Sequence, residues 1–113
     1  MPKYMLLLRD DREGFASLSP EQLQKTSEKY MAWRRKHFVV DGQRLEDGGQ
    51  VMQKKNGSVT LTDGPFSESR EVLGGYYTIE AASMEEAVSL LHDHPHIEFG
   101  SIEIRPVFVL PQL

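Results

Sequence analysis

Residues 3–9, Lys3-Tyr4-Met5-Leu6-Leu7-Leu8-Arg9, carry the pattern that decides the fold class. In an extended chain, successive side chains point to opposite sides of a sheet. Every second residue from Tyr4 would therefore face one side, and Met5 and Leu7 would face the other. Apolar side chains on both sides predict a strand that is covered on both of its faces.

The bulk composition is that of one ordinary globular domain. A chain of 113 residues fits a single domain, since domains run ~100–200 residues. The formal net charge of -4, from 17 acidic and 13 basic residues, argues against nucleic-acid binding, because such proteins need a basic surplus to neutralise phosphates. The absence of cysteine excludes a disulfide framework, a thiolate metal site and a cysteine nucleophile.

The longest apolar run near the start is too short for a targeting or membrane segment. It covers Met5–Leu8 and ends at the charged residues 9–12. A signal peptide needs ~7–15 apolar residues, and a membrane span needs ~18. We therefore expect a cytoplasmic location and no contact with a membrane.

The clearest helix signal begins at Ser19, after a polar loop over residues 10–17. Ser19 is the expected N-cap of a capping box, and Pro20 takes the first helical position. The helix is expected to end near Phe38, because residues 39–42, Val-Val-Asp-Gly, are β-branched and then form a turn.

The remaining segments predict a hairpin, a strand, a second helix and a last strand. Asn56-Gly57 supplies the two positive-φ positions of a type I′ turn, while the signal over residues 43–50 is weak. The expected segments are the hairpin strands 51–55 and 58–62, the strand 76–81, a helix that opens with the capping box at residues 83–86 and is closed by Pro95, and the strand 101–109.

This order predicts an α+β domain of the ferredoxin-like type, βαββαβ with an extra hairpin. Both helices would cross one face of a single antiparallel sheet. The other face would then be an exposed apolar patch, and such patches usually mark an interface. Two sheets that pack face to face across a two-fold axis would cover it, so we expect a homodimer.

The most distinctive stretch is Asp63-Gly64-Pro65-Phe66, a tight and rigid corner followed by the polar residues 67–71. Asp63 can accept hydrogen bonds from nearby backbone N–H groups in such a corner. Further on, Gly74-Gly75 either bends the strand or lets a backbone or ligand come close.

Four stretches together resemble the DGPF-type branch of the YCII-related proteins. They are residues 63–66 (Asp-Gly-Pro-Phe), 74–76 (Gly-Gly-Tyr), 102–106 (Ile-Glu-Ile-Arg-Pro) and the opening 3–7. The resemblance implies a dimeric α/β-barrel of ferredoxin-like protomers and implies little about activity. Some relatives look like small-molecule enzymes with a His–Asp pair, and others are associated with extracytoplasmic-function sigma factors. Arg70 departs from the pattern, because a lysine is usual there.

Three histidines lie before the last expected strand. His92 and His96 are four residues apart, with His94 between them, which suggests a metal site. However, Pro95 disfavours the helical conformation for His94, so the rings should not share one helical face. A histidine-rich helix end facing the helix dipole is the alternative, and we predict no metal site.

The first functional hypothesis is a small-molecule-binding protein with a pocket between the sheet and the helices. Asp63 would act as the acid–base group or polar anchor, Arg70 and Arg105 would hold an anionic group, and Tyr76 would line the wall. The alternative for Asp63 is a cap on its own turn. Tyr30, Trp33, Tyr76 and Tyr77 fit a pocket wall and a packed core equally well.

Two other hypotheses stay open. The chain would be a non-catalytic regulatory or interaction module, as the sigma-factor association implies, with a protein partner on the dimer surface. A cofactor-independent isomerase- or oxygenase-like activity fits the fold by analogy alone. No phosphate loop or dinucleotide fingerprint is present, so we expect no cofactor, and the sequence leaves open whether the protein is an enzyme.

Overall fold

The computed structural model describes residues 1–64 and 72–111, with residues 12 and 13 described only in their backbone. It contains a four-stranded antiparallel sheet in the order β2-β5-β1-β6 and a two-stranded sheet, β3-β4. The strands are β1 (Lys3–Asp10), β2 (Val39–Arg44), β3 (Gln50–Lys55), β4 (Ser58–Asp63), β5 (Val72–Glu80) and β6 (Gly100–Pro106). The helices are α1 (Arg12–Ala16), α2 (Pro20–Arg34), α3 (Met84–Leu90) and the short 3-10 helix η1 (Pro95–Glu98).

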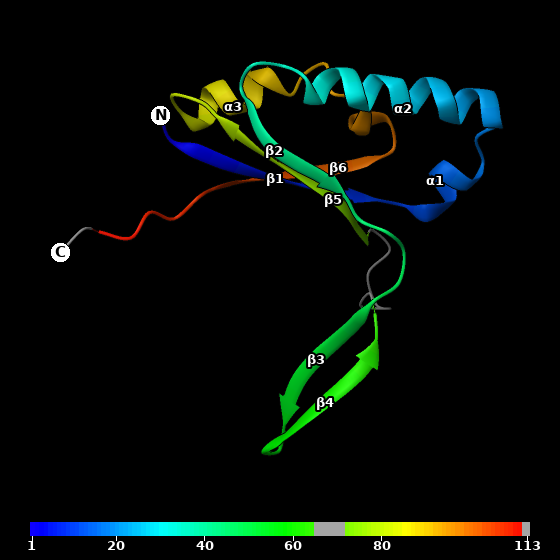
Figure 1. The fold of residues 1–113 in the computed structure, drawn as a ribbon, viewed down its shortest axis with the longest axis vertical. Helices are drawn as coiled ribbons and strands as arrows, with labels where there is room; N and C mark the ends of the chain where they lie inside the picture. The colour runs from blue at the N-terminus through cyan, green and yellow to red at the C-terminus, as the bar shows by residue number, and fades with distance from the viewer. Residues whose placement is uncertain (65–71, 112–113) are drawn as a thin grey trace.

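The helices and the hairpin lie on different sides of the larger sheet. Figure 1 shows α2 and α3 on one side, while the β3–β4 hairpin projects away on the other and the C-terminal tail extends from the end of β6. This arrangement confirms the prediction of a mixed α+β chain with an antiparallel sheet and a few helices. Within the described ranges, no helix is long and apolar enough to cross a membrane.

The core lies between the sheet and α2, and it follows the alternation predicted for β1. The register places Leu6 opposite Tyr77 and Tyr4 opposite Ile79, and all four side chains are buried on the helix side. Trp33 of α2 packs on this layer with its ring centroid 4.9 Å from that of Tyr77. Burying such large apolar side chains contributes roughly 1.5–3 kcal/mol each.

The start of α2 was predicted correctly, but its end was not. The Ser19 hydroxyl accepts from the Gln22 amide at 3.2 Å, and the Gln22 side chain accepts from the Ser19 amide at 2.9 Å. The helix ends at Arg34 rather than near Phe38, because a turn brings the Phe38 ring within 5.4 Å of Trp33. The loop expected over residues 10–17 contains the short helix α1.

The segment expected to end in a turn at residues 39–42 is instead the edge strand β2. Gly42 lies inside this strand, opposite Tyr77. A Cβ atom at Gly42 would lie 2.6 Å from Cδ1 of Tyr77 and 3.1 Å from the Tyr76 carbonyl oxygen. The glycine therefore permits a close approach of two strands, and its turn-forming property is not used.

The hairpin was predicted correctly as a local unit. Asn56 and Gly57 have φ angles of 49° and 81°, as a turn with two positive-φ residues requires. The hairpin strands pair only with each other among the described strands. They therefore form a separate ribbon, and β2 takes the remaining place in the larger sheet.

The last two sheet strands differ from their predicted limits. β5 begins at Val72 rather than at residue 76. A Cβ atom on its Gly75 would lie 3.0 Å from the Gln43 carbonyl oxygen, so the close approach of a backbone, one of the two predicted roles, is confirmed, while at Gly74 the Asp10 side chain comes close. β6 ends at Pro106 rather than at residue 109. The Val107 amide still donates to the Lys3 carbonyl at 2.9 Å, but β1 begins there and offers no further strand partner.

Candidate ligand-binding site

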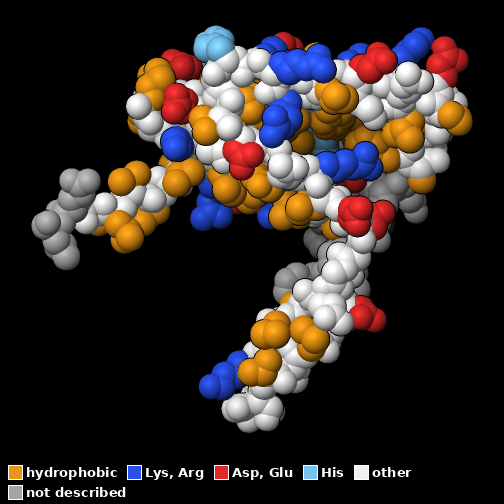
Figure 2. Space-filling view, in the orientation of Figure 1, with side chains coloured by type: hydrophobic (Ala, Val, Ile, Leu, Met, Phe, Trp, Pro, Cys, Tyr) orange, Lys and Arg blue, Asp and Glu red, His pale blue; other side chains and the backbone are white. Residues whose placement is uncertain are grey.

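A cavity of about 670 Å³ lies between α2 and the sheet, within the ~300–1,000 Å³ typical of small-molecule sites. Figure 2 shows a hollow in this face of the molecule, with charged side chains at its rim. One wall is a stripe of α2 side chains one turn apart, because positions three and four residues apart share a helix face. The stripe includes Leu23, Ser27, Tyr30, Met31 and Arg34.

The floor of the cavity comes from β5 and β2. It includes Gly42 of β2 and the Gly74-Gly75 pair of β5, together with Tyr77. Glycine at these positions lets neighbouring strands and the Asp10 side chain come close. The glycines therefore let the floor pack tightly, with the Tyr77 ring, the Asp10 carboxylate and the β2 backbone in the space that side chains would take.

The central polar contact joins Tyr30 of α2 to His96 of η1. The Tyr30 hydroxyl lies 2.7 Å from His96 Nδ1, and His96 Nε2 lies 2.8 Å from the Arg9 carbonyl oxygen. A carbonyl oxygen only accepts hydrogen bonds, so Nε2 carries a proton. In the neutral ring Nδ1 is then the acceptor, and the Tyr30 hydroxyl donates to it. The lone pairs of the Tyr30 oxygen stay available to a ligand.

Burial keeps the two tyrosines of the cavity protonated. Desolvation raises the pKa of Tyr30 far above its usual value of 10, and the charges of Tyr77 and Asp10 raise it further, while Arg44 opposes them. Desolvation also raises the pKa of Tyr77, against the opposing charge of Arg34. At neutral pH both phenols therefore act as neutral hydrogen-bonding groups.

An aromatic wall surrounds the Tyr30–His96 pair. Phe15 of α1 stacks on Phe99 with ring centroids 4.8 Å apart. Its ring also lies at a tilt to Tyr30 and His96, at centroid distances of 6.4 and 6.5 Å. This wall suits the flat face of a ring-shaped ligand, because aromatic pairs favour offset and tilted contacts.

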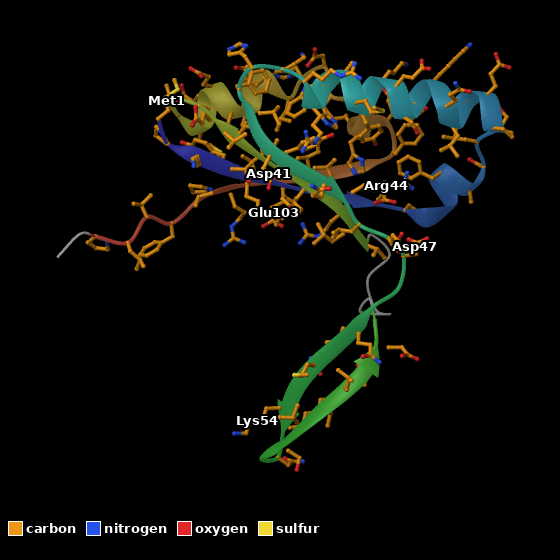
Figure 3. All side chains as sticks on the ribbon, viewed as in Figure 1. Met1, Asp41, Arg44, Asp47, Lys54 and Glu103 are labelled. Carbon is orange, nitrogen blue, oxygen red and sulfur yellow. The ribbon has the colours of Figure 1, made fainter. Side chains whose placement is uncertain are left out.

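The two arginines that line the cavity differ in the hydrogen bonds and ion pairs that they make within the protein. Arg34 Nε donates to the Gly42 carbonyl at 2.9 Å, and Arg34 lies 3.8 Å from Asp41, which ties α2 to β2. Arg44 has no carboxylate within ion-pairing distance among the described residues. Figure 3 shows it on β2, near α1 and below α2. Arg44 is therefore the cation that can meet an anionic group of a ligand.

The structure brings only one of the predicted site residues to the cavity. Tyr76 is one of the residues that bound it, but its side chain alternates with the buried Tyr77 and lies on the open face of the sheet, with its hydroxyl 3.5 Å from Asp41 Oδ2. Asp63 ends β4 on the hairpin, and Arg105 lies 3.3 Å from Glu103 on β6; neither lines the cavity. Arg70 falls outside the described residues. The roles predicted for Asp63, Arg70 and Arg105 stay predictions.

The central pair was not identified from the sequence. Tyr30 fitted a core and a pocket equally well, and His96 received no role. The available signal was Pro95, because a proline opens a new helical turn as readily as it closes a helix. In this chain Pro95 begins η1, and η1 places the His96 ring beside Tyr30 of α2.

The other histidines do not form the expected helix end. α3 ends at Leu90, and His94 is the N-cap of η1, with its Nδ1 accepting from the His96 amide at 3.0 Å. Burial, and then the charge of His96, lower the pKa of His94 to about 3, while His92 is exposed. Among the described residues, no three His, Asp or Glu side chains are arranged to hold a metal ion.

Comparison with known proteins agrees with the fold and assigns the family. The model of the YCII-related domain matches residues 3–111, so the chain belongs to the YCII-related family. An uncharacterised protein of Rhizobium meliloti (strain 1021) is 29% identical, over 92% of this chain and 90% of that protein.

A solved structure shares the fold of this chain. It is a 5-chloro-2-hydroxyhydroquinone dehydrochlorinase from Burkholderia phenoliruptrix in complex with 2,5-dihydroxybenzoquinone. The match has a TM-score of 0.50 at 13% identity and covers 91% of this chain and 90% of the other. At this identity the similarity concerns the fold and carries no assignment of activity.

Proposed function

We propose that the chain binds a small organic molecule in the cavity between α2 and the sheet. The observation that carries the proposal is the Tyr30–His96 hydrogen bond at the wall of a cavity of about 670 Å³. Protein interiors are otherwise packed to the density of organic crystals. A space of this size beside an ordered polar pair is therefore suited to a ligand.

The cavity walls define the chemistry of the ligand. The aromatic wall of Phe15 and Tyr30 favours a ring. The Tyr30 oxygen accepts a hydrogen bond, since its own proton goes to His96, so the ring should carry a hydroxyl or N–H donor. Arg44 favours one negative charge at the rim, and because Asp10, Glu46 and Asp47 also line the cavity, that charge has to lie at Arg44. A hydroxylated ring compound with a single anionic group meets all three requirements.

The pair also supports proton transfer. When a ligand hydroxyl donates to the Tyr30 oxygen, its proton can pass to Tyr30 while the Tyr30 proton passes to His96 Nδ1. The ligand becomes an anion, Tyr30 stays neutral and His96 becomes an imidazolium ion. This relay avoids a Tyr30 anion, which the raised pKa disfavours. In this proposal the pair takes the acid–base role that the sequence suggested for Asp63.

The fold neighbour fits this proposal in general terms, because it is an enzyme in complex with a small hydroxylated ring compound. The proposal does not extend its reaction to this chain. The non-catalytic interaction module stays the alternative function.

The decisive experiment blocks the cavity from α2. Ser27 lines it, whereas Gln24 lies on the exposed face of the same helix. We expect Ser27→Phe to weaken binding of hydroxylated aromatic acids at least tenfold, measured by ligand-observed NMR, and Gln24→Phe to leave it unchanged. Native mass spectrometry of untagged protein identifies any co-purified molecule. Equal binding by both variants would refute the proposal, and no binding by the unmodified chain would favour the interaction module.

We also propose that two copies assemble through the open face of the larger sheet, in the face-to-face barrel of ferredoxin-like protomers that the DGPF-type resemblance implies. Met5, Leu7 and Tyr76 share this face by the strand register, and they are only partly buried. Sedimentation equilibrium of the unmodified chain tests the assembly, and a monomer at ~100 µM would contradict it.

A further inference from the structure

The β3–β4 hairpin presents one apolar face to solvent. The register pairs Met52 with Leu61 and Lys54 with Val59, so three large apolar side chains share a face. The exposed fractions of Met52, Val59 and Leu61 are 69%, 64% and 53%. The opposite face is mostly polar and consists of the pairs Val51–Thr62, Gln53–Thr60 and Lys55–Ser58. Such one-sided patterning is typical of a ribbon that lies on another surface.

The hairpin has little support within its own chain. Among the described residues, no hydrogen bond joins β3 or β4 to the larger sheet, and an isolated two-stranded hairpin is marginally stable in water. The radius of gyration is 16.5 Å, whereas a compact chain of this length would have about 13 Å. The chain is therefore too extended to cover its own apolar surface.

The C-terminal tail is a second apolar projection. Phe108, Val109 and Leu110 have exposed fractions of 79%, 80% and 76%. The tail continues from β6, which is an edge of the larger sheet. Figure 2 shows hydrophobic side chains on both the hairpin and the tail, with a basic group near the tip of the hairpin.

The same chain also carries a surface that such projections fit. The open face of the larger sheet contains the partly buried Met5 and Leu7. Beside them lie Glu103, 2.6 Å from Arg9, and Arg105, 3.3 Å from the same carboxylate. Figure 1 shows that the hairpin projects on this side of the sheet, opposite α2 and α3.

We propose that the hairpin is a docking arm that lies along the β1–β6 side of the open sheet face of a second copy, beside the contact between the two sheets, with Met52, Val59 and Leu61 turned inward and the tail packed beside it. The inference rests on the two-copy assembly proposed above and identifies the segments that hold it together. A two-fold axis makes each copy both donor and recipient, so one contact covers the arm, the tail and the face of both chains. The charges are complementary as well, because Lys54 and Asp63 at the two ends of the arm can meet Glu103 and Arg105.

A charge placed on either face of the arm tests its orientation. Leu61 and Thr60 are neighbours on β4 with side chains on opposite faces. We expect Leu61→Glu to weaken the dimer about thirtyfold or more in sedimentation equilibrium, as for a central interface residue, and Thr60→Glu to weaken it less than about threefold. A dimer equally resistant to both changes overturns the arm but leaves the two-copy assembly. A monomeric unmodified chain overturns both.

Disulfide trapping gives a second test that does not depend on destabilising the hairpin. The chain contains no cysteine, so introduced thiols are unique. We expect Met52→Cys protein, mixed with Leu7→Cys protein under mild oxidation, to form a mixed disulfide at least tenfold faster than Gln53→Cys protein mixed with the same partner. Equal rates for Met52 and Gln53 would show that the apolar face does not lie on the second copy. Neither test involves a ligand, so their outcome is separable from that of the cavity.

Discussion

The Tyr30 hydroxyl and His96 Nδ1 lie 2.7 Å apart, although 66 residues separate them in the chain. This contact joins α2 to η1, and His96 continues it to the backbone of β1 through the Arg9 carbonyl. These two hydrogen bonds thus connect α2, η1 and β1 at the wall of the cavity. The same groups that would contact a ligand therefore also hold the cavity together.

Replacing Tyr30 by phenylalanine should affect both stability and binding. His96 is 2% exposed, so its Nδ1 atom would lose its partner in a buried position, at a cost of about 1–3 kcal/mol in the free energy of unfolding. Urea denaturation measures this loss. A ligand that donates to the Tyr30 oxygen should bind about fivefold more weakly, as expected for the loss of ~1 kcal/mol. Tyr4→Phe makes the same chemical change outside the cavity, and an equal loss of binding in that variant would contradict the assignment.

His94 should make stability depend on pH. Its pKa in the folded protein is about 3, against 6.5 ordinarily, so folding favours the neutral ring. The neutral ring contributes fully to the free energy of unfolding above pH ~6.5, and this contribution is lost as pH falls towards 3. Each unit of difference between the folded and unfolded pKa is worth about 1.4 kcal/mol.

His94→Asn provides the matched variant for this test, because asparagine keeps an N-cap acceptor and does not titrate. Urea midpoints at pH 4, 5 and 7 should fall more steeply in the unmodified protein than in the variant. Parallel pH profiles would show that His94 is not the group responsible.

Gly42→Ala should destabilise the fold by about 1–3 kcal/mol, the usual cost of overpacking. The added methyl group would lie 2.6 Å from Cδ1 of Tyr77, so the tyrosine ring or the β2 backbone must move. Gly14→Ala is the control, because the nearest atoms there are 3.9 Å away and alanine favours the helical conformation. Thermal unfolding of the two variants measures the difference, and a smaller loss at Gly42 than at Gly14 would contradict the packing argument.

Asp63→Asn tests whether Asp63 or the Tyr30–His96 pair is the acid–base group. The residue ends β4 and does not line the cavity, so we expect the ligand dissociation constant to change less than about twofold. Isothermal titration with the ligand found for the unmodified chain measures it. Loss of binding with an unchanged melting temperature would instead support the site predicted from the sequence.

The elements that were predicted correctly depend on local chemistry. Ser19 and Gln22 each accept from the other's backbone amide at the start of α2, Pro20 has no amide that needs a partner, and Asn56-Gly57 supplies its own turn. The predicted secondary structure is wrong where contact with a residue far away in the sequence determines the local conformation. Val39 and Val40 are β-branched and favour a strand, and Tyr77 across the sheet makes Gly42 a position of close packing. Likewise, α2 ends at Arg34 because Phe38 turns back onto Trp33.

The sequence by itself determined the class of the fold, the apolar alternation of β1 and the hairpin turn, because these follow from periodicity and from residues that interact within a few positions. The family was recognised separately, from the resemblance of four sequence stretches to known proteins. Only the tertiary structure decided that the hairpin stands apart from the larger sheet, and that Tyr30 and His96 meet. The physical reason is that a cavity is bounded by side chains from α2, η1, β2 and β5 at once. No local pattern specifies which of them will be close in space.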